Sequence, residues 1–71
     1  MEFDYKILRG KIYEVCRTQT AFAKAIGLGR TSLSLRLHNK LEFTQDEIRK
    51  SCKVLDINVS DIPKYFFTEK V

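Results

Sequence analysis

Apolar residues recur three or four positions apart along most of the chain, and this spacing predicts helices. The first helix is expected over about residues 4–16, with Asp4 as its N-cap. Its inner stripe consists of Leu8, Ile12 and Val15. Gly10 lies inside this helix, where it either permits a close crossing with another helix or is a tolerated surface glycine.

A second helix is predicted over about residues 18–26. Thr18 can cap its start, and Gly27 follows where a left-handed residue commonly ends a helix. The inward residues are Phe22, Ala23 and Ile26.

The third predicted helix runs from about Arg30 to His38 and ends before a turn at Asn39 and Lys40. A helix, a short turn containing glycine and another helix predict a helix-turn-helix motif over about residues 18–38. Leu33 and Leu37 are about 40° apart around such a helix, so both can share its inner face.

The fourth helix has the clearest start signal, because Thr44 and Glu47 have the spacing of a capping box. Phe43 is expected to pack on Ile48, and the inner stripe continues through Ile48, Cys52 and Leu55. Ser60 is the expected cap of a short fifth helical turn that extends through Tyr65. No segment shows the alternation of a strand, so we predict an all-α fold of five helices in one domain over residues 1–71.

Positive charge is concentrated in the middle of the chain. The net charge is +4, yet residues 15–41 contain no acid and five bases, namely Arg17, Lys24, Arg30, Arg36 and Lys40. A polyanion is the natural partner of such a segment, because each neutralised phosphate releases counterions. A solvated face that keeps the protein soluble is the alternative.

Other chemistry finds little support in the composition. His38 is the only histidine, so we expect no catalytic triad, no metal site and no cofactor, and we predict that the protein is not an enzyme. Cys16 and Cys52 are expected to be thiols that act as small buried apolar residues. Since the sequence has neither a signal peptide nor a long apolar run, we expect a cytoplasmic, nucleoid-associated protein with no membrane or small-molecule partner.

The stretch from Gln19 to Ser34, QTAFAKAIGLGRTSLS, resembles the helix-turn-helix of short phage Cro-like and lambda-repressor-like (XRE-type) regulators. Ala23, Gly27 and Leu33 occupy the small, turn and apolar positions of that motif. The first helix, the capped fourth helix and the aromatic ending are also similar to these regulators. The resemblance implies a lambda-repressor-like domain that binds a double-stranded DNA operator, as a homodimer and without a cofactor.

The resemblance also assigns contacts to individual residues. The predicted base contacts are Arg30, Thr31 and Leu35, since Arg can bond guanine and an exposed leucine can meet a thymine methyl group. A single stray surface leucine is the alternative for Leu35. The predicted phosphate contacts are Gln19, Ser32, Arg36, His38, Asn39 and Lys40. Capping or turn formation is the alternative for Ser32 and Asn39, and packing along the protein surface is the alternative for Arg36.

The aromatic run Tyr65-Phe66-Phe67 cannot be wholly buried by one helical turn. It either completes a small core or provides contacts for a dimer. The function that we predict is transcriptional repression at a phage or prophage switch. A protein-interaction module such as an antirepressor is the alternative of a different class, and an activator or excision regulator would share the same fold.

Overall fold

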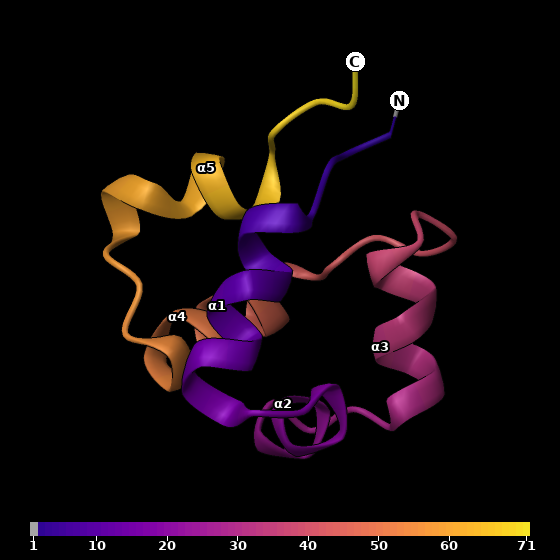
Figure 1. Ribbon diagram of the computed structural model, residues 1–71, viewed down its shortest axis with the longest axis vertical. Helices are drawn as coiled ribbons and strands as arrows, with labels where there is room; N and C mark the ends of the chain where they lie inside the picture. The colour runs from indigo at the N-terminus through magenta and orange to yellow at the C-terminus, as the bar shows by residue number, and fades with distance from the viewer. Residues whose placement is uncertain (1) are drawn as a thin grey trace.

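Five α-helices follow one another in the computed structural model, which describes residues 2–71 (Figure 1). They are α1 (Lys6–Cys16), α2 (Gln19–Ala25), α3 (Arg30–Leu37), α4 (Gln45–Leu55) and α5 (Ile62–Phe66), and a 3-10 turn, η1 (Val59–Asp61), precedes α5. Within residues 2–71 there is no strand, and the two ends of the chain meet in one isolated bridge between Phe3 and Glu69. The predicted all-α class with five helices is therefore confirmed.

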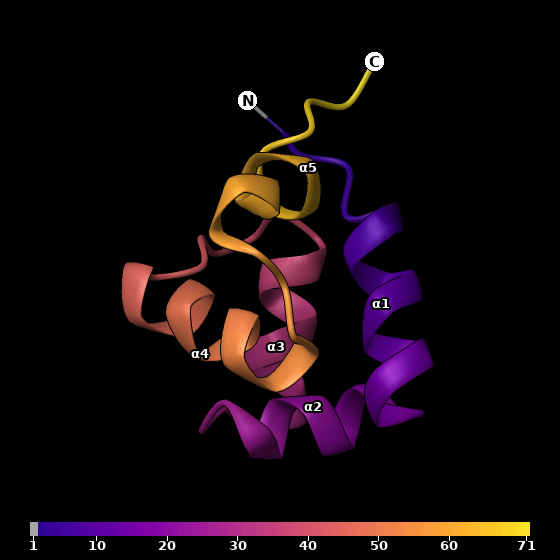
Figure 2. The same ribbon diagram turned by 90° about the vertical axis from the view of Figure 1, so that its left-hand side faces the viewer.

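Different helices form the two ends of the molecule. α2 crosses below α1, α3 and α4, whereas α5 and both chain ends lie at the opposite end (Figure 2). α1 extends between these ends, from the termini down to α2 (Figure 1). Surfaces at the two ends of α1 are thus built from different parts of the sequence.

The core takes apolar side chains from all five helices. Its buried members are Tyr5, Leu8, Ile12, Phe22, Ala23, Ile26, Leu33, Leu37, Leu55, Ile57 and Phe66. Val15, which was expected to face inward, is 44% exposed. In the last turn of α1, where α2 crosses, Cys16 packs against the core instead.

Most helix starts agree with the sequence signals, and two differ. Thr18 and Thr44 cap α2 and α4, and the capping box with Glu47 is complete. α1 begins two residues later than Asp4, whose carboxylate instead accepts a hydrogen bond from the Lys6 amide at 2.9 Å. Asn58 takes the role expected of Ser60, because its side chain accepts the Ser60 amide and starts η1.

Gly10 is exposed, and a side chain placed there would meet nothing within 4 Å. The interpretation as a surface glycine is therefore correct, and no helix crosses closely at this position.

Candidate interaction surfaces

In the segment predicted to form a helix-turn-helix, two helices, α2 and α3, are joined by a short connection over residues 26–29. The Thr18 side chain accepts a hydrogen bond from the Ala21 amide at 3.0 Å and begins α2. At its end, Gly27 has a φ of 81°, and the Leu28 amide donates to the Ala23 carbonyl at 2.8 Å. Ala23 and Leu33 are both buried where the two helices pack, so the small residue and the apolar anchor hold α3 against α2.

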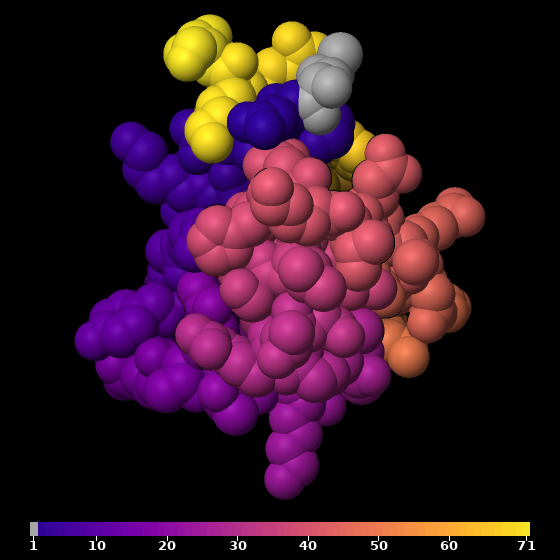
Figure 3. Space-filling model, turned by 90° about the vertical axis from the view of Figure 1, so that its right-hand side faces the viewer, coloured from indigo at the N-terminus to yellow at the C-terminus, as the bar shows by residue number. Residues whose placement is uncertain are grey.

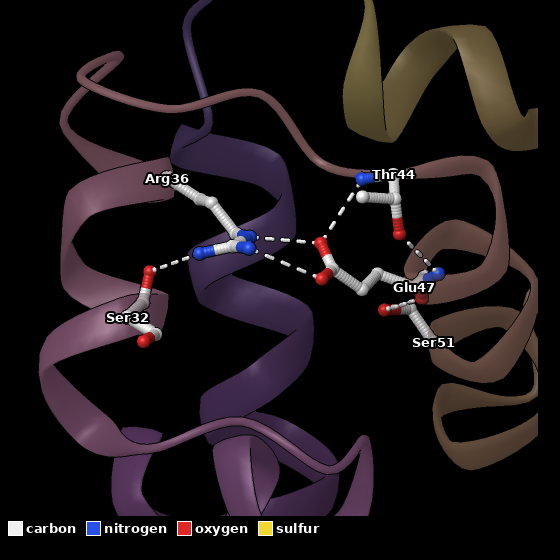
Figure 4. A network of polar contacts seen from close by, with 5 residues as sticks. All are labelled: Ser32, Arg36, Thr44, Glu47 and Ser51. Carbon is white, nitrogen blue, oxygen red and sulfur yellow. Dashed lines mark hydrogen bonds and ion pairs between the residues drawn. The ribbon is translucent and has the colours of Figure 1, made fainter.

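A second attachment joins α3 to α4 through Arg36 (Figure 4). Its guanidinium donates to both carboxylate oxygens of Glu47, at 2.8 and 3.1 Å, and to the Ser32 carbonyl at 2.8 Å. The same Glu47 carboxylate accepts the Thr44 amide at 3.0 Å, which completes the capping box. One carboxylate thus starts α4 and fixes the position of α3.

The Glu47 carboxyl is buried and yet charged. Burial opposes its ionisation, but the hydrogen bonds from Arg36 and from the Thr44 backbone outweigh burial and lower the pKa of Glu47 below its ordinary value. Three donors of the Arg36 guanidinium are used inside the molecule, and the side chain is only 13% exposed. The predicted phosphate contact of Arg36 stays untested, but the structure gives this side chain a position along the protein surface.

The residues predicted to contact bases are exposed on α3. Arg30 and Thr31 are exposed at its first turn, and Leu35 is 39% exposed one turn later. α3 forms the raised middle of one face of the molecule, with α2 below it and α1 to one side (Figure 3). With Arg36 engaged, Arg30 is the exposed base of this helix.

The remaining predicted phosphate contacts lie in different settings. Lys40 and His38 are exposed, and the His38 ring nitrogen Nδ1 lies 2.8 Å from the Ser34 carbonyl oxygen. Ser32 is half-buried and contributes its carbonyl to Arg36. Gln19 is half-buried and lines a surface hollow that Arg30 also lines.

Asn39 fastens the N-terminal segment of the chain. Its side-chain amide accepts the Phe3 amide at 2.8 Å and donates to the Phe3 carbonyl at 3.0 Å. The C-terminal segment pairs with the same segment, since the Asp4 amide donates to the Thr68 carbonyl at 2.7 Å and the Lys70 amide donates to the Glu2 carbonyl at 3.0 Å. We call residues 2–4 and 68–70 together the terminal clasp. The turn role expected as one alternative for Asn39 is present, with a φ of 62°.

Phe3 of the terminal clasp is one of the rings of an aromatic hollow. This hollow encloses about 180 Å³ and is lined by Phe3, Tyr5, Glu42, Phe43, Ile48, Phe66 and Phe67. Its rings meet edge to face, with centroids 5.7 Å apart for Phe3 and Phe67 and 5.3 Å apart for Phe43 and Phe66. Phe67 is 50% exposed, so the hollow presents an open apolar wall to solvent.

One polar group sits inside this apolar wall. The Tyr5 ring stacks edge-on against Phe43 with the centroids 5.4 Å apart. Burial, followed by the nearby Glu42 carboxylate, raises the pKa of Tyr5, so its hydroxyl is neutral over the physiological range. The Tyr5 hydroxyl and the Glu42 carboxylate are the polar side-chain groups among the residues that line the hollow.

The sequence indicated only part of the aromatic hollow. The run Tyr65-Phe66-Phe67 was expected to divide between core and surface, and it does, with Phe66 buried and Phe67 exposed. Phe3 and Tyr5 were not predicted to join it, because the pairing of the two chain ends has no signal at helical spacing.

A second hollow lies at the other end of α1. Arg9, Tyr13 and Arg17 line it from α1 and the residue after it, and Ile12, Thr18, Gln19 and Arg30 also line it. The first three residues were not predicted as site residues, although their spacing of four positions would place them on one helix face.

Residues 2–71 contain neither a membrane-spanning helix nor a cluster of metal ligands. No helix there has the length and apolar character needed to cross a membrane. Nor do these residues bring together three or more His, Cys, Asp or Glu side chains that could hold a metal ion.

Comparisons with known proteins place this architecture in a family. The chain is similar to the solution structure of the modulator of repression (MOR) of the temperate bacteriophage TP901-1 from Lactococcus lactis, with 51% sequence identity and a TM-score of 0.83. The likeness covers 100% of this chain and 96% of that chain. No curated protein matches the sequence. A family model described as "Protein of unknown function (DUF739)" matches residues 1–69, and this chain therefore belongs to the DUF739 family.

Proposed function

We propose that this protein regulates repression in a phage switch by binding a repressor protein. The likeness to a phage modulator of repression supports a regulatory role rather than a catalytic one. The observation that carries the proposal is the aromatic hollow, which is concave and apolar and has Phe67 half-exposed at its wall. Aromatic side chains at open pockets are typical anchors of protein interfaces.

The α3 surface also favours a protein partner over DNA as the main ligand. Arg36 is paired with Glu47, so the middle of α3 offers Thr31, Ser34 and Leu35 to a partner and little positive charge. Specific binding to duplex DNA depends on several cationic contacts to phosphates. The exposed Leu35, with the hydroxyl groups of Thr31 and Ser34 on the same helix, can contact a protein surface as well as a DNA base.

The test is the affinity of untagged protein for the repressor encoded by the same phage, measured by calorimetry. Phe67→Ser should weaken binding about 30-fold or more, since hot-spot aromatics contribute about 2 kcal/mol or more. Val59→Ser is the matched control, because Val59 is exposed but does not line the hollow. Equal affinities for both variants and the unchanged protein would show that the hollow is not the docking site.

Direct contact with an operator is a second candidate function. Exposed Arg30 and Thr31 at the start of α3, within a segment that lacks acids, favour it. In this case Arg30, Thr31 and Leu35 would contact bases, and Gln19, Ser32, His38, Asn39 and Lys40 would contact phosphates. A homodimer on a two-fold site would place its α3 helices about 34 Å apart.

Two substitutions separate this candidate from the first. Arg30→Ala should cost about 1–3 kcal/mol on a selected duplex and relax the preference at one position per half-site. Lys40→Ala should weaken all duplexes alike and lower the salt slope by about 1 per subunit. Site selection from random duplexes provides the probe, and failure to enrich any sequence would exclude the second candidate.

A further inference from the structure

Three arginines line the hollow at the α2 end of the molecule, which we call the arginine hollow. Arg9 lies in α1, Arg17 follows its last residue, and Arg30 begins α3. Tyr13 lines the same hollow and is 67% exposed. The hollow has a volume of about 290 Å³ and opens to solvent, so a side chain of a partner can enter it.

The charge of this hollow is not balanced within the molecule. None of the ion pairs formed among residues 2–71 includes Arg9, Arg17 or Arg30. Arg9 donates to the Leu37 carbonyl at 3.2 Å, a contact that orients the guanidinium without neutralising it. The acid nearest in sequence to Arg17 is Glu14, which is paired with Lys11 at 3.7 Å, and residues 15–41 contain no acid. A carboxylate from outside the chain can therefore balance this charge.

The composition of the hollow indicates which anion fits. Arginine forms paired hydrogen bonds with a carboxylate, and Tyr and Arg are the residues most enriched at the energetic centres of protein interfaces. The three arginines line one concave site, and the exposed Tyr13 ring gives this site an apolar surface. A duplex backbone instead needs cations spread along a row of phosphates, and one of the two arginines of α3, Arg36, is paired with Glu47.

We propose that the arginine hollow is a docking site for a glutamate or aspartate side chain of a protein partner. The proposal rests on the proposed function in one respect, because the repressor is the partner considered first. It adds a second, charged contact surface at the end of α1 opposite the aromatic hollow. A length of 11 residues separates the two ends of that helix, which corresponds to about 16 Å. One partner can thus bind the aromatic hollow with an apolar side chain and the arginine hollow with an acidic side chain at the same time.

The first experiment needs no repressor. A blocked hexaglutamate peptide is titrated into the full-length protein while the side-chain Nε–Hε signals of the arginines are followed by NMR. We expect saturable shifts for Arg9, Arg17 and Arg30, and their loss in Arg17→Gln. A short DNA duplex is titrated in parallel. If the duplex moves the same signals at a lower concentration than the peptide, the site serves nucleic acid and the proposal is overturned.

The second experiment measures repressor affinity at several salt concentrations. Arg17→Gln and Arg30→Gln should each weaken binding about tenfold and reduce its dependence on salt. Lys24→Gln removes the same charge from an exposed position on α2 that does not line the hollow. It should change affinity less than twofold, because solvent screens an exposed charge outside the site.

Equal losses of affinity in all three variants would indicate a diffuse positive field and contradict a defined site. Normal binding by both arginine variants would contradict it as well, while leaving the proposed function intact. A repressor that fails to bind the unchanged protein would reject the proposed function, and the peptide titration would still decide the fate of the arginine hollow.

Discussion

Glu47 is a single buried acid on which two helices depend. Its carboxylate caps α4 through the Thr44 amide and holds α3 through Arg36. The sequence predicted the first of these roles from the capping-box spacing. It did not predict the second, because residues 36 and 47 are brought together only by the turn between α3 and α4. Arg36 was predicted to contact phosphate or to pack along the protein surface, and no spacing in the sequence indicated Glu47 as its partner.

Glu47→Gln should lower the free energy of unfolding by about 1–3 kcal/mol at pH 7, since hydrogen bonds to a charged group are lost. The folded state lowers the pKa of this carboxyl, so its stabilisation is complete above the ordinary value of 4.5 and is lost as pH falls through the lower folded value. The difference between the two proteins should therefore shrink below about pH 4.5. Urea denaturation at pH 7, 5 and 3 measures this difference in the free energy of unfolding between the unchanged protein and Glu47→Gln.

Asp46→Asn is the control for this acid effect. Asp46 is also paired, with Arg49 and Lys50, but it is exposed, so solvent screens the interaction. If the pH dependence of stability disappears in Asp46→Asn and persists in Glu47→Gln, Asp46 is its source, and the prediction for Glu47 is wrong.

At the scale of one element, α1 has a weakness that substitution can remove. Gly10 is exposed in its middle, and a methyl group there would meet open space. Gly10→Ala should raise the free energy of unfolding by about 0.5–1 kcal/mol, because alanine restricts the unfolded chain more and favours the helix. Gly27→Ala is the opposite case, since its φ of 81° strains any other residue, and it should destabilise by about 1 kcal/mol. Thermal melts of both variants test the pair, and a loss of stability in Gly10→Ala would contradict an open surface at that position.

The elements that the sequence predicted best are those whose ends are determined by capping or turn residues. Thr18, Gly27 and the Thr44–Glu47 pair act on neighbours a few residues away, so their effects can be worked out locally. Val15 shows the limit of this reasoning, because its exposure depends on where α2 crosses α1. The aromatic and arginine hollows have the same limit, since each combines residues from three or more parts of the chain.

At the scale of the whole molecule, the terminal clasp closes the fold. Asn39→Gly removes both hydrogen bonds to Phe3 while a residue that tolerates the φ of 62° remains in place. We expect the free energy of unfolding to fall by about 1–2 kcal/mol. Hydrogen exchange at the Asp4 and Lys70 amides should accelerate, whereas exchange in the middle of α1 should follow global unfolding only. Unchanged exchange at both clasp amides would show that Asn39 does not hold the ends together.

The clasp also determines how the protein can be handled. Both ends of the chain leave the fold side by side, next to Phe3 and Phe67 (Figure 1). An affinity handle or a reporter domain fused to either end would therefore compete for space with a partner at the aromatic hollow. A fluorophore attached on α2, at the far end of the molecule, would leave that hollow open. A negative two-hybrid result with a terminal fusion would consequently measure crowding and not affinity.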